Sequence, residues 1–216
     1  MSAENALREH MCILAKSLFD RGLTHGSTGN LSARTEDGGL LVSPTGTCFG
    51  RLDPRRLSRF DPQGVQVSGD PPTKEMPLHM AFYDTRSTAG AVVHLHSCYS
   101  VALSMLPDLD ADDFLPPLTP YGIMKLGKVK LLPFFVPGDP AIGDAVRGLK
   151  GRRSAVVLAH HGPVVAGKDV EAACNAIEEL EDTARLALMM RGMDTVGLSE
   201  DQVCAVVTKF DVPWDD

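Results

Sequence analysis

The chain has 216 residues, of which 44% are hydrophobic and 23% are charged, and its formal net charge is −7. This composition is typical of a globular protein, and the length suits one sizeable domain, which we expect to cover residues 1–216. The negative charge argues against non-specific nucleic-acid binding, which depends on a positive surface. We find no apolar run long enough to span a membrane and no secretory signal, and the five scattered cysteines exclude a disulfide framework. The sequence therefore predicts a cytoplasmic protein with no membrane or nucleic-acid partner.

The first half of the chain alternates helical and strand patterns. Apolar residues at i, i+3 and i+4 predict an amphipathic helix at the N-terminus, and short apolar runs predict strands. The expected elements are a helix over 2–20, strands over 31–34 and 40–42, a short helix or turn over 54–57, a strand pair ending near 67, and a helix that starts at Glu75 and runs through Phe82. Loops rich in Gly, Ser and Thr flank the first two strands.

The second half continues this alternation and ends in two helices. Asp169 is the expected N-cap and Gly192 the expected C-cap of the longest helix. The expected elements are a strand over 90–97, a short helix over 100–106, a loop over 107–120, a strand-rich patch over 129–136, a helix over 141–149, a buried strand over 155–159, a long helix over 169–191 and a last helix over 199–210. This order predicts an α/β domain with a central sheet and helices packed on it.

Two histidines lie two residues apart in the apolar segment 90–97, at positions 94 and 96. On a strand, alternate side chains share a face, so His94 and His96 are expected to point the same way. Two such imidazoles can bind one zinc ion, although a pair of hydrogen-bonded histidines without a metal is the alternative. Glu75 upstream and the His160-His161-Gly162 step downstream favour the metal, because a catalytic zinc site is built from three protein ligands and an open position.

Two loops of small residues, 26–30 and 45–47, offer backbone N–H groups and hydroxyls. Glycines let such a backbone approach an anion closely, and turn amides form anion-binding nests. The alternative is a pair of ordinary turns. Neither loop matches a nucleotide-binding motif. Beside a metal, the two loops suit a small phosphorylated substrate.

Glu75 follows a Pro72-Thr73-Lys74 step at the expected start of a helix. A lone glutamate at this position commonly complements the helix dipole. Close to a metal, the same carboxylate can instead act as a ligand or as the general acid and base.

These segments together resemble the class II aldolase family of fuculose-, rhamnulose- and ribulose-phosphate enzymes. Five short motifs occur in the family's order over about residues 24 to 165: Gly-Ser-Thr-Gly-Asn, Ser-Pro-Thr-Gly, Pro-x-x-Glu, His-x-His and His-Gly. Each motif alone is weak, but five in order are specific. The resemblance implies a single three-layer α/β/α domain with a central mixed, largely antiparallel sheet.

The resemblance also implies a role for individual residues. The zinc ligands, one ion per chain, would be His94, His96 and His161, with His160 as a competitor for the third position. Glu75 would be the catalytic acid and base, and a fourth ligand when no substrate is bound. The expected substrate- and phosphate-binding residues are Ser27, Thr28, Gly29, Asn30, Thr45, Gly46, Thr73 and Lys74. Family members are usually four-fold symmetric tetramers with a tyrosine from a neighbouring subunit as proton donor, and Tyr121 is the candidate here.

Lys74 departs from the pattern of the sugar-phosphate aldolases, which usually have Ser-Ser before the glutamate. A cation next to Glu75 suggests an additional anionic group on the substrate, and a carboxylate is the natural choice. The Thr-Lys-Glu step resembles the family's decarboxylase branch, the 3-oxo-tetronate 4-phosphate decarboxylases. The alternative is a solvated lysine at the start of a helix.

The sequence thus predicts a zinc-dependent lyase that decarboxylates a 3-oxo-tetronate 4-phosphate, through an enediolate, to dihydroxyacetone phosphate and CO2. Three alternatives remain open at this point. One is an aldolase that cleaves a ketose 1-phosphate, another is a ribulose 5-phosphate epimerase, and the third is a non-enzymatic binding domain of the adducin type. Another divalent metal in place of zinc also remains open.

Overall fold

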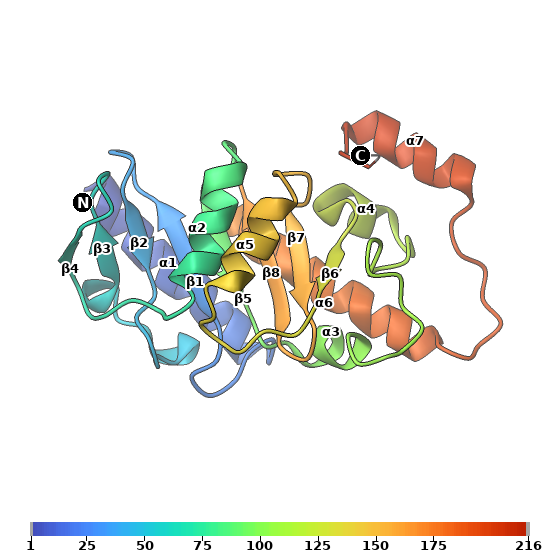
Figure 1. Ribbon diagram of the computed structural model, residues 1–216, viewed down its shortest axis with the longest axis horizontal. Helices are drawn as coiled ribbons and strands as arrows, with labels where there is room; N and C mark the ends of the chain where they lie inside the picture. Colours follow the sequence, from blue (N-terminus) through green and yellow to red (C-terminus); the bar gives the residue numbers. More distant parts are fainter. Residues whose placement is uncertain (1, 215–216) are drawn as a thin grey trace.

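One eight-stranded sheet runs through residues 2–214, the part of the chain that the computed structural model describes (Figure 1). Its strand order is β4-β3-β2-β1-β5-β8-β7-β6. The paired neighbours are antiparallel, except for β6 and β7, which are parallel. The strands are β1 (Asn30–Arg34), β2 (Leu40–Val42), β3 (Ser58–Phe60), β4 (Gln66–Ser68), β5 (Ala91–His94), β6 (Lys130–Leu132), β7 (Ala155–Leu158) and β8 (Gly162–Gly167). The predicted mixed, largely antiparallel sheet is confirmed.

Helices cover both faces of this sheet, which gives the predicted three layers (Figure 1). Helices α2 and α5 pack on one face, and α1, α3 and α6 pack on the other, while α7 lies against α4 at the end of a long connection. The helices are α1 (Ala3–Asp20), α2 (Met76–Thr85), α3 (Cys98–Leu103), α4 (Pro120–Leu126), α5 (Ala141–Gly148), α6 (Val170–Met190) and α7 (Glu200–Phe210), with short 3-10 turns η1 (Phe49–Arg51) and η2 (Pro54–Arg56). Among the described residues, no helix has the length and apolar character needed to cross a bilayer.

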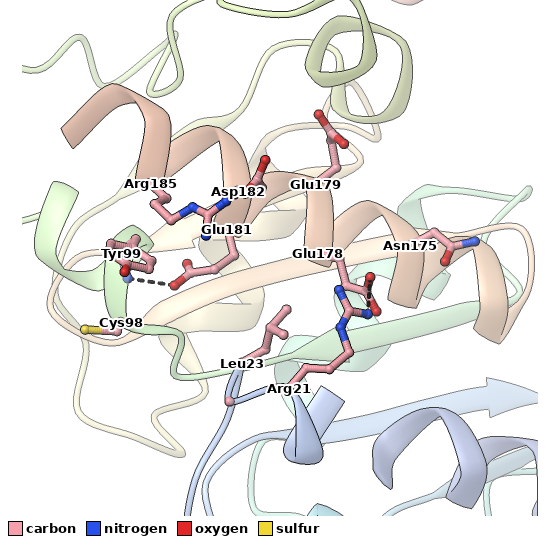
Figure 2. Close-up of a pocket in the computed structure, with 11 residues that line it drawn as sticks. Arg21, Leu23, Cys98, Tyr99, Asn175, Glu178, Glu179, Glu181, Asp182 and Arg185 are labelled. Atoms are coloured by element: carbon pink, nitrogen blue, oxygen red, sulfur yellow. Dashed lines mark hydrogen bonds and ion pairs between the residues drawn. The ribbon is translucent and has the colours of Figure 1, made fainter. Parts of the chain in front are cut away.

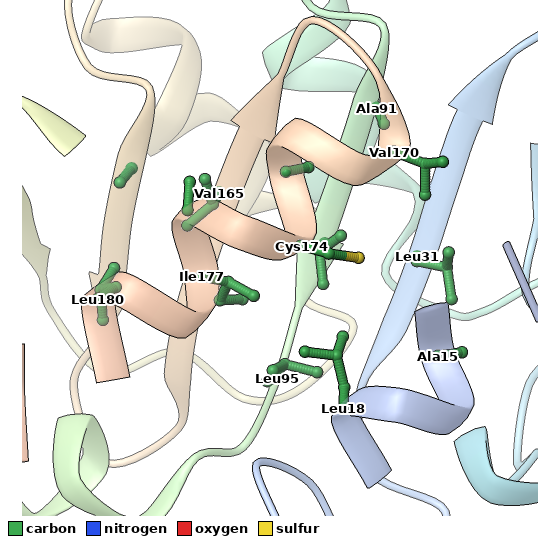
Figure 3. Close-up of a cluster of buried hydrophobic side chains, with 14 of the residues drawn as sticks. Ala15, Leu18, Leu31, Ala91, Leu95, Val165, Val170, Cys174, Ile177 and Leu180 are labelled. Carbon is green, nitrogen blue, oxygen red and sulfur yellow. The ribbon is translucent and has the colours of Figure 1, made fainter. Parts of the chain in front are cut away.

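The apolar run of β5 is explained by burial on both faces. Val92 belongs to the core under α2 and α5, whereas its neighbour Val93 belongs to the core under α1 and α6. Figure 3 shows the second of these cores, where Ile177 and Leu180 of α6 and Leu95 after β5 are fully buried. A central strand without a solvent face cannot show polar alternation, so it reads as a continuous hydrophobic segment.

Two elements were not predicted from the sequence. Strand β8 lies between β5 and β7, but its Gly162-Pro163 start has the composition of a loop. Helix α4 falls after the segment expected to be a loop; its N-cap Thr119 accepts a hydrogen bond from the N–H of Gly122, and Pro120 occupies the first turn. That Thr-Pro start is a helix signal that the sequence analysis did not use.

Several boundaries differ from the expectation. Strand β5 ends at His94, so His96 lies beyond the paired segment. Glu75 is the N-cap residue of α2 and not its first helical residue. Strand β6 stops at Leu132, because Pro133 has no N–H to continue the pairing. The predicted N-cap Asp169 is confirmed, since its side chain accepts a hydrogen bond from the N–H of Ala172.

The burial of α6 gives a direct test of the fold with two isoleucines. Ile177 is 0% exposed, whereas Ile13 on α1 is 63% exposed. We expect Ile177→Ala to lower the free energy of unfolding by about 2–5 kcal/mol, because it removes buried methyl groups and leaves a cavity. The matched change Ile13→Ala should stay within about 0.5 kcal/mol of the parent. Urea unfolding of both variants measures the difference, and equal losses would contradict this packing.

Candidate metal centre

Three histidines and one glutamate converge at the end of β5. Their ligand atoms all lie within 4.8 Å of one another, and the residues are Glu75, His94, His96 and His161. The Nε2 atoms of His161 and His96 are 3.0 Å apart, and those of His94 and His161 are 3.3 Å apart. Oε2 of Glu75 lies 3.4 Å from Nε2 of His94, and Oε1 of Glu75 lies 3.5 Å from Nε2 of His161.

The backbone of Gly162 brings the third histidine to the other two. Gly162 has φ +145°, and a Cβ atom there would lie 2.1 Å from the carbonyl oxygen of Leu95. Only glycine therefore fits where the turn between β7 and β8 passes the end of β5. This close approach places His161 against His96, with ring centroids 4.5 Å apart.

His160 lies outside the cluster although it precedes His161 directly. Its backbone is left-handed, with φ +61°, and its side chain is exposed. Its N–H donates to the hydroxyl of Ser104, and its ring lies 6.5 Å from that of Phe134. Of the two candidates for the third ligand, the structure therefore brings His161 to the other histidines.

The histidines of the cluster are held uncharged at neutral pH. Burial is the main cause that lowers the pKa of His94 and of His96 to about 3, with the neighbouring histidines adding to the shift. Burial also lowers the pKa of His161. The Nδ1–H of His94 donates a hydrogen bond of 2.9 Å to the carbonyl oxygen of Pro163, so the Nε2 lone pair of His94 faces the cluster.

The residues fit a divalent metal. Tetrahedral zinc with Zn–N bonds of about 2.0–2.1 Å places two ligand nitrogens about 3.3 Å apart. The observed separations of 3.0 and 3.3 Å are close to this value. In addition, the Oε1 atom of Glu75 is buried without a hydrogen-bond partner in the described chain. An unpaired carboxylate oxygen beside three uncharged imidazoles is the donor set expected of such a site.

The two predicted substrate loops contact the segments that carry the cluster residues, and their own residues differ in exposure. A Cβ on Gly29 would lie 3.0 Å from the carbonyl oxygen of His94, so the first loop packs against the end of β5. The second loop is joined to the segment before α2, because the N–H of Thr73 donates to Ser43. The exposed members of the predicted set are Ser27, Thr45, Gly46 and Lys74, the half-buried ones are Thr28 and Gly29, and the buried ones are Asn30 and Thr73.

Two buried members of that set are already engaged with Glu75. The amide Nδ2 of Asn30 donates to Oε2 of Glu75 over 2.7 Å, and the hydroxyl of Thr73 accepts from the N–H of Glu75 over 3.2 Å. By contrast, Tyr121 is 61% exposed on α4. Within residues 2–214, no hydrogen bond, ion pair or ring contact joins Tyr121 to the cluster.

Sequence reasoning missed His79, which contacts Asn30 from α2. His79 is 0% exposed, and burial lowers its pKa to about 3. The signal that could have found it is its position four residues after Glu75, which puts both side chains on one face of a helix.

A separate pocket of about 460 Å³ lies between α1, α3 and α6 (Figure 2). Its charged lining is structural: Glu178 pairs with Arg21 at 2.6 Å, and Glu181 accepts hydrogen bonds from the N–H groups of Tyr99 and Ser100. These contacts tie α6 to the end of α1 and to the first turn of α3. None of the four cluster residues lines this pocket.

Comparison with known proteins identifies the family. The chain belongs to the class II aldolase and adducin N-terminal domain family, whose model matches residues 9–188. The resemblance recognised in the sequence is thereby confirmed.

Three relatives illustrate the similarity. A 3-oxo-tetronate 4-phosphate decarboxylase of Escherichia coli (strain K12) is 46% identical over 187 residues, which cover 87% of this chain and 88% of that protein. An L-fuculose phosphate aldolase of Methanococcus maripaludis is 32% identical over 83% of this chain and 95% of its own. The crystal structure of YgbL, a putative aldolase/epimerase/decarboxylase from Escherichia coli, superimposes with a TM-score of 0.92 at 42% identity and covers 95% of this chain and 99% of that one.

The metal centre makes a prediction about its third ligand. We expect His161→Ala to lose most bound metal, because it removes one of three converging imidazoles, whereas His160→Ala should keep one metal per chain. Metal analysis of the purified proteins after dialysis measures both, and His94→Ala serves as a positive control for loss. Full metal content in His161→Ala together with loss in His160→Ala would transfer the ligand to His160.

Proposed function

We propose that this protein is a metal-dependent carbon–carbon lyase that decarboxylates a 3-oxo-tetronate 4-phosphate to dihydroxyacetone phosphate and CO2. The observation that carries the proposal is the convergence of Glu75 with three histidines. In the sequence, Glu75 directly follows the cationic residue Lys74. Similarity supports the substrate class, because the decarboxylase of Escherichia coli is 46% identical and the fuculose phosphate aldolase of Methanococcus maripaludis only 32%.

His94, His96 and His161 would hold the metal, and we propose zinc, since three imidazoles suit this ion. When bound, zinc supplies a Lewis acid that draws electrons from the substrate's hydroxyl and ketone oxygens. Because their pKa values are lowered, the three imidazoles are uncharged before the cation binds, and binding does not require them to lose protons.

Glu75 is positioned to carry the proton. Its Oε2 atom is fixed by the amide of Asn30 at 2.7 Å, while its Oε1 atom has no hydrogen-bond partner in the described chain. The reaction breaks the bond between the carboxyl carbon and C2, and the carboxyl group leaves as CO2. C2 then takes up one proton, which Glu75 would first accept from solvent, to give dihydroxyacetone phosphate. The unpaired oxygen is the atom that can deliver this proton, and the paired one holds the carboxylate in place.

The loops supply donors for the phosphate. The backbone N–H groups of Ser27, Gly29 and Gly46 have no acceptor within the described chain. Such N–H groups in glycine-rich turns bind anions. The phosphate would therefore lie between the first loop and the Thr45-Gly46 turn, with hydroxyls of the same loops around it.

Lys74 is the proposed partner of the substrate carboxylate. Its side chain is exposed, and it has no ion pair among residues 2–214. Because Lys74 directly precedes Glu75, we propose that its charge lies beside the site of decarboxylation. We further propose that the enzyme is a single-domain homotetramer, in which Tyr121 reaches the centre of a neighbouring subunit as a proton donor.

The assay that tests the function uses the purified protein loaded with zinc. It should release dihydroxyacetone phosphate and CO2 in equal amounts from a 3-oxo-tetronate 4-phosphate. Fuculose 1-phosphate serves as the comparison substrate, and release of dihydroxyacetone phosphate from it alone would replace the decarboxylase by an aldolase.

Replacement of the catalytic carboxylate tests the proton transfer. Glu75→Gln should keep the fold and most of the metal but lower kcat by about 10²–10⁴-fold, because an amide cannot carry a proton between substrate atoms. Steady-state kinetics and metal analysis of the same preparation measure both effects. A kcat within a few-fold of the parent would remove Glu75 from the mechanism.

Lys74 tests the choice between lyase types. A hydrogen bond to a charged group contributes about 1.5–3 kcal/mol, so Lys74→Ser should lower kcat/KM on the oxo-acid phosphate by about 10- to 100-fold. Metal content and activity on a ketose 1-phosphate should be unchanged or higher. Lys168→Ser, at another exposed lysine without an ion pair in the described chain, is the matched control. An equal loss on both substrates would make Lys74 a structural or phosphate-binding residue.

A further inference from the structure

A row of buried polar side chains leads away from Glu75 between β1 and α2. Asn30 and Ser32 alternate along β1 and therefore share the face that α2 covers. His79 and Tyr83 follow Glu75 by one and two turns of α2, so they share a face of the helix. Their exposed fractions are 6% for Asn30, 4% for Tyr83 and 0% for Ser32 and His79.

These side chains form a continuous series of hydrogen bonds. Asn30 Nδ2 is 2.7 Å from Glu75 Oε2, and Asn30 Oδ1 is hydrogen-bonded to Nε2 of His79. On the other side of the ring, Nδ1 of His79 is 2.7 Å from the hydroxyl of Ser32. The Ser32 hydroxyl is in turn 2.9 Å from that of Tyr83.

Donor and acceptor chemistry fixes the direction of each bond. Asn30 donates its N–H to Oε2 of Glu75, so its carbonyl oxygen is left to accept from His79. His79 must then carry its proton on Nε2. His79 is 0% exposed, and its two ring nitrogens contact an amide oxygen and a hydroxyl, neither of which carries a charge that could pair with an imidazolium, so the ring is neutral. Nδ1 of His79 is therefore an acceptor, which makes Ser32 its donor and Tyr83 the donor to Ser32.

We propose that His79 is a positioning residue for the acid–base carboxylate. With its proton on Nε2, it holds the Asn30 amide in the one orientation that directs N–H towards Glu75. A reversed amide would set its carbonyl oxygen against the carboxylate. One oxygen of Glu75 is thus fixed by the series, and the other remains directed at the substrate. The inference rests on the proposed function for the role of Glu75, and it gives Asn30 a role in holding Glu75.

The proton arrangement can be tested without any assay of activity. Side-chain ¹⁵N NMR of protein labelled at histidine should show His79 as the neutral tautomer protonated at Nε2, with its signals assigned by their loss in His79→Gln. A tautomer protonated at Nδ1 would overturn the proposal, because Asn30 would then have to turn its carbonyl towards Glu75.

Two variants separate positioning from simple structural support. Leucine at position 79 fills space without hydrogen bonds, whereas glutamine retains an N–H near the place of Nε2. Partners that orient catalytic groups at metal sites typically contribute about 10- to 100-fold. We expect His79→Leu to lower kcat by that factor, with KM within about two-fold and metal content unchanged, and His79→Gln to recover kcat to within about five-fold of the parent.

Thr85→Val is the control on the same helix: the Thr85 hydroxyl is half-buried and donates to the carbonyl of Ala81, outside the series, so kcat should stay within about three-fold of the parent. The melting temperature of every variant is measured, and kinetics are run well below the lowest value. The proposal is overturned if His79→Leu keeps the parent's kcat, or if His79→Gln is folded and as slow as His79→Leu.

The proposed function and this inference fail in different ways. If the parent enzyme releases no CO2 from the oxo-acid phosphate, the function is wrong, while the NMR result still decides the proton arrangement at His79. If His79→Leu does not fold, His79→Gln and the tautomer together decide the case.

Discussion

The close approach of Gly162 to the carbonyl of Leu95 is the contact on which the metal centre depends. This approach lets the turn after β7 pass the end of β5. A Cβ atom at position 162 would lie only 2.1 Å from the carbonyl oxygen of Leu95. The antiparallel pairing of β8 with both β5 and β7 fixes the opposite ends of the same segments. Histidines 65 residues apart in the chain therefore meet through sheet geometry and not through a flexible loop.

The carboxylate reaches the centre by a different route, through the packing of α2 on β1. Buried polar groups are tolerated where each donor finds an acceptor, and a fully satisfied network also makes its members rigid. From Tyr83 to Oε2 of Glu75 each side chain of the series has a hydrogen-bond partner, along one face of the helix and one face of the strand, whereas Oε1 of Glu75 has none in the described chain. The same contacts that hold α2 to the sheet thus orient Glu75.

The site joins a rigid, buried floor to an open rim. His94 is 0% exposed and Glu75 is 7% exposed, whereas Lys74 and Thr45 are exposed. Buried imidazoles are uncharged and suit the proposed cation, while the proposed phosphorylated acid would enter from water. The division of the site into a buried cluster of imidazoles and exposed loops fits the opposite requirements of the proposed metal and the proposed phosphate.

The sequence by itself determined the fold class, the order of most elements and the four residues that converge, because apolar runs and short motifs are local properties. It assigned the third position to His161 but left His160 as a competitor, since the exclusion of His160 depends on its left-handed backbone and on the turn at Gly162. It missed β8, whose Gly-Pro start becomes a strand only when β5 and β7 pair on both sides. Only the tertiary structure revealed His79, because its partners Asn30 and Ser32 belong to a strand some 47 to 49 residues away in the chain.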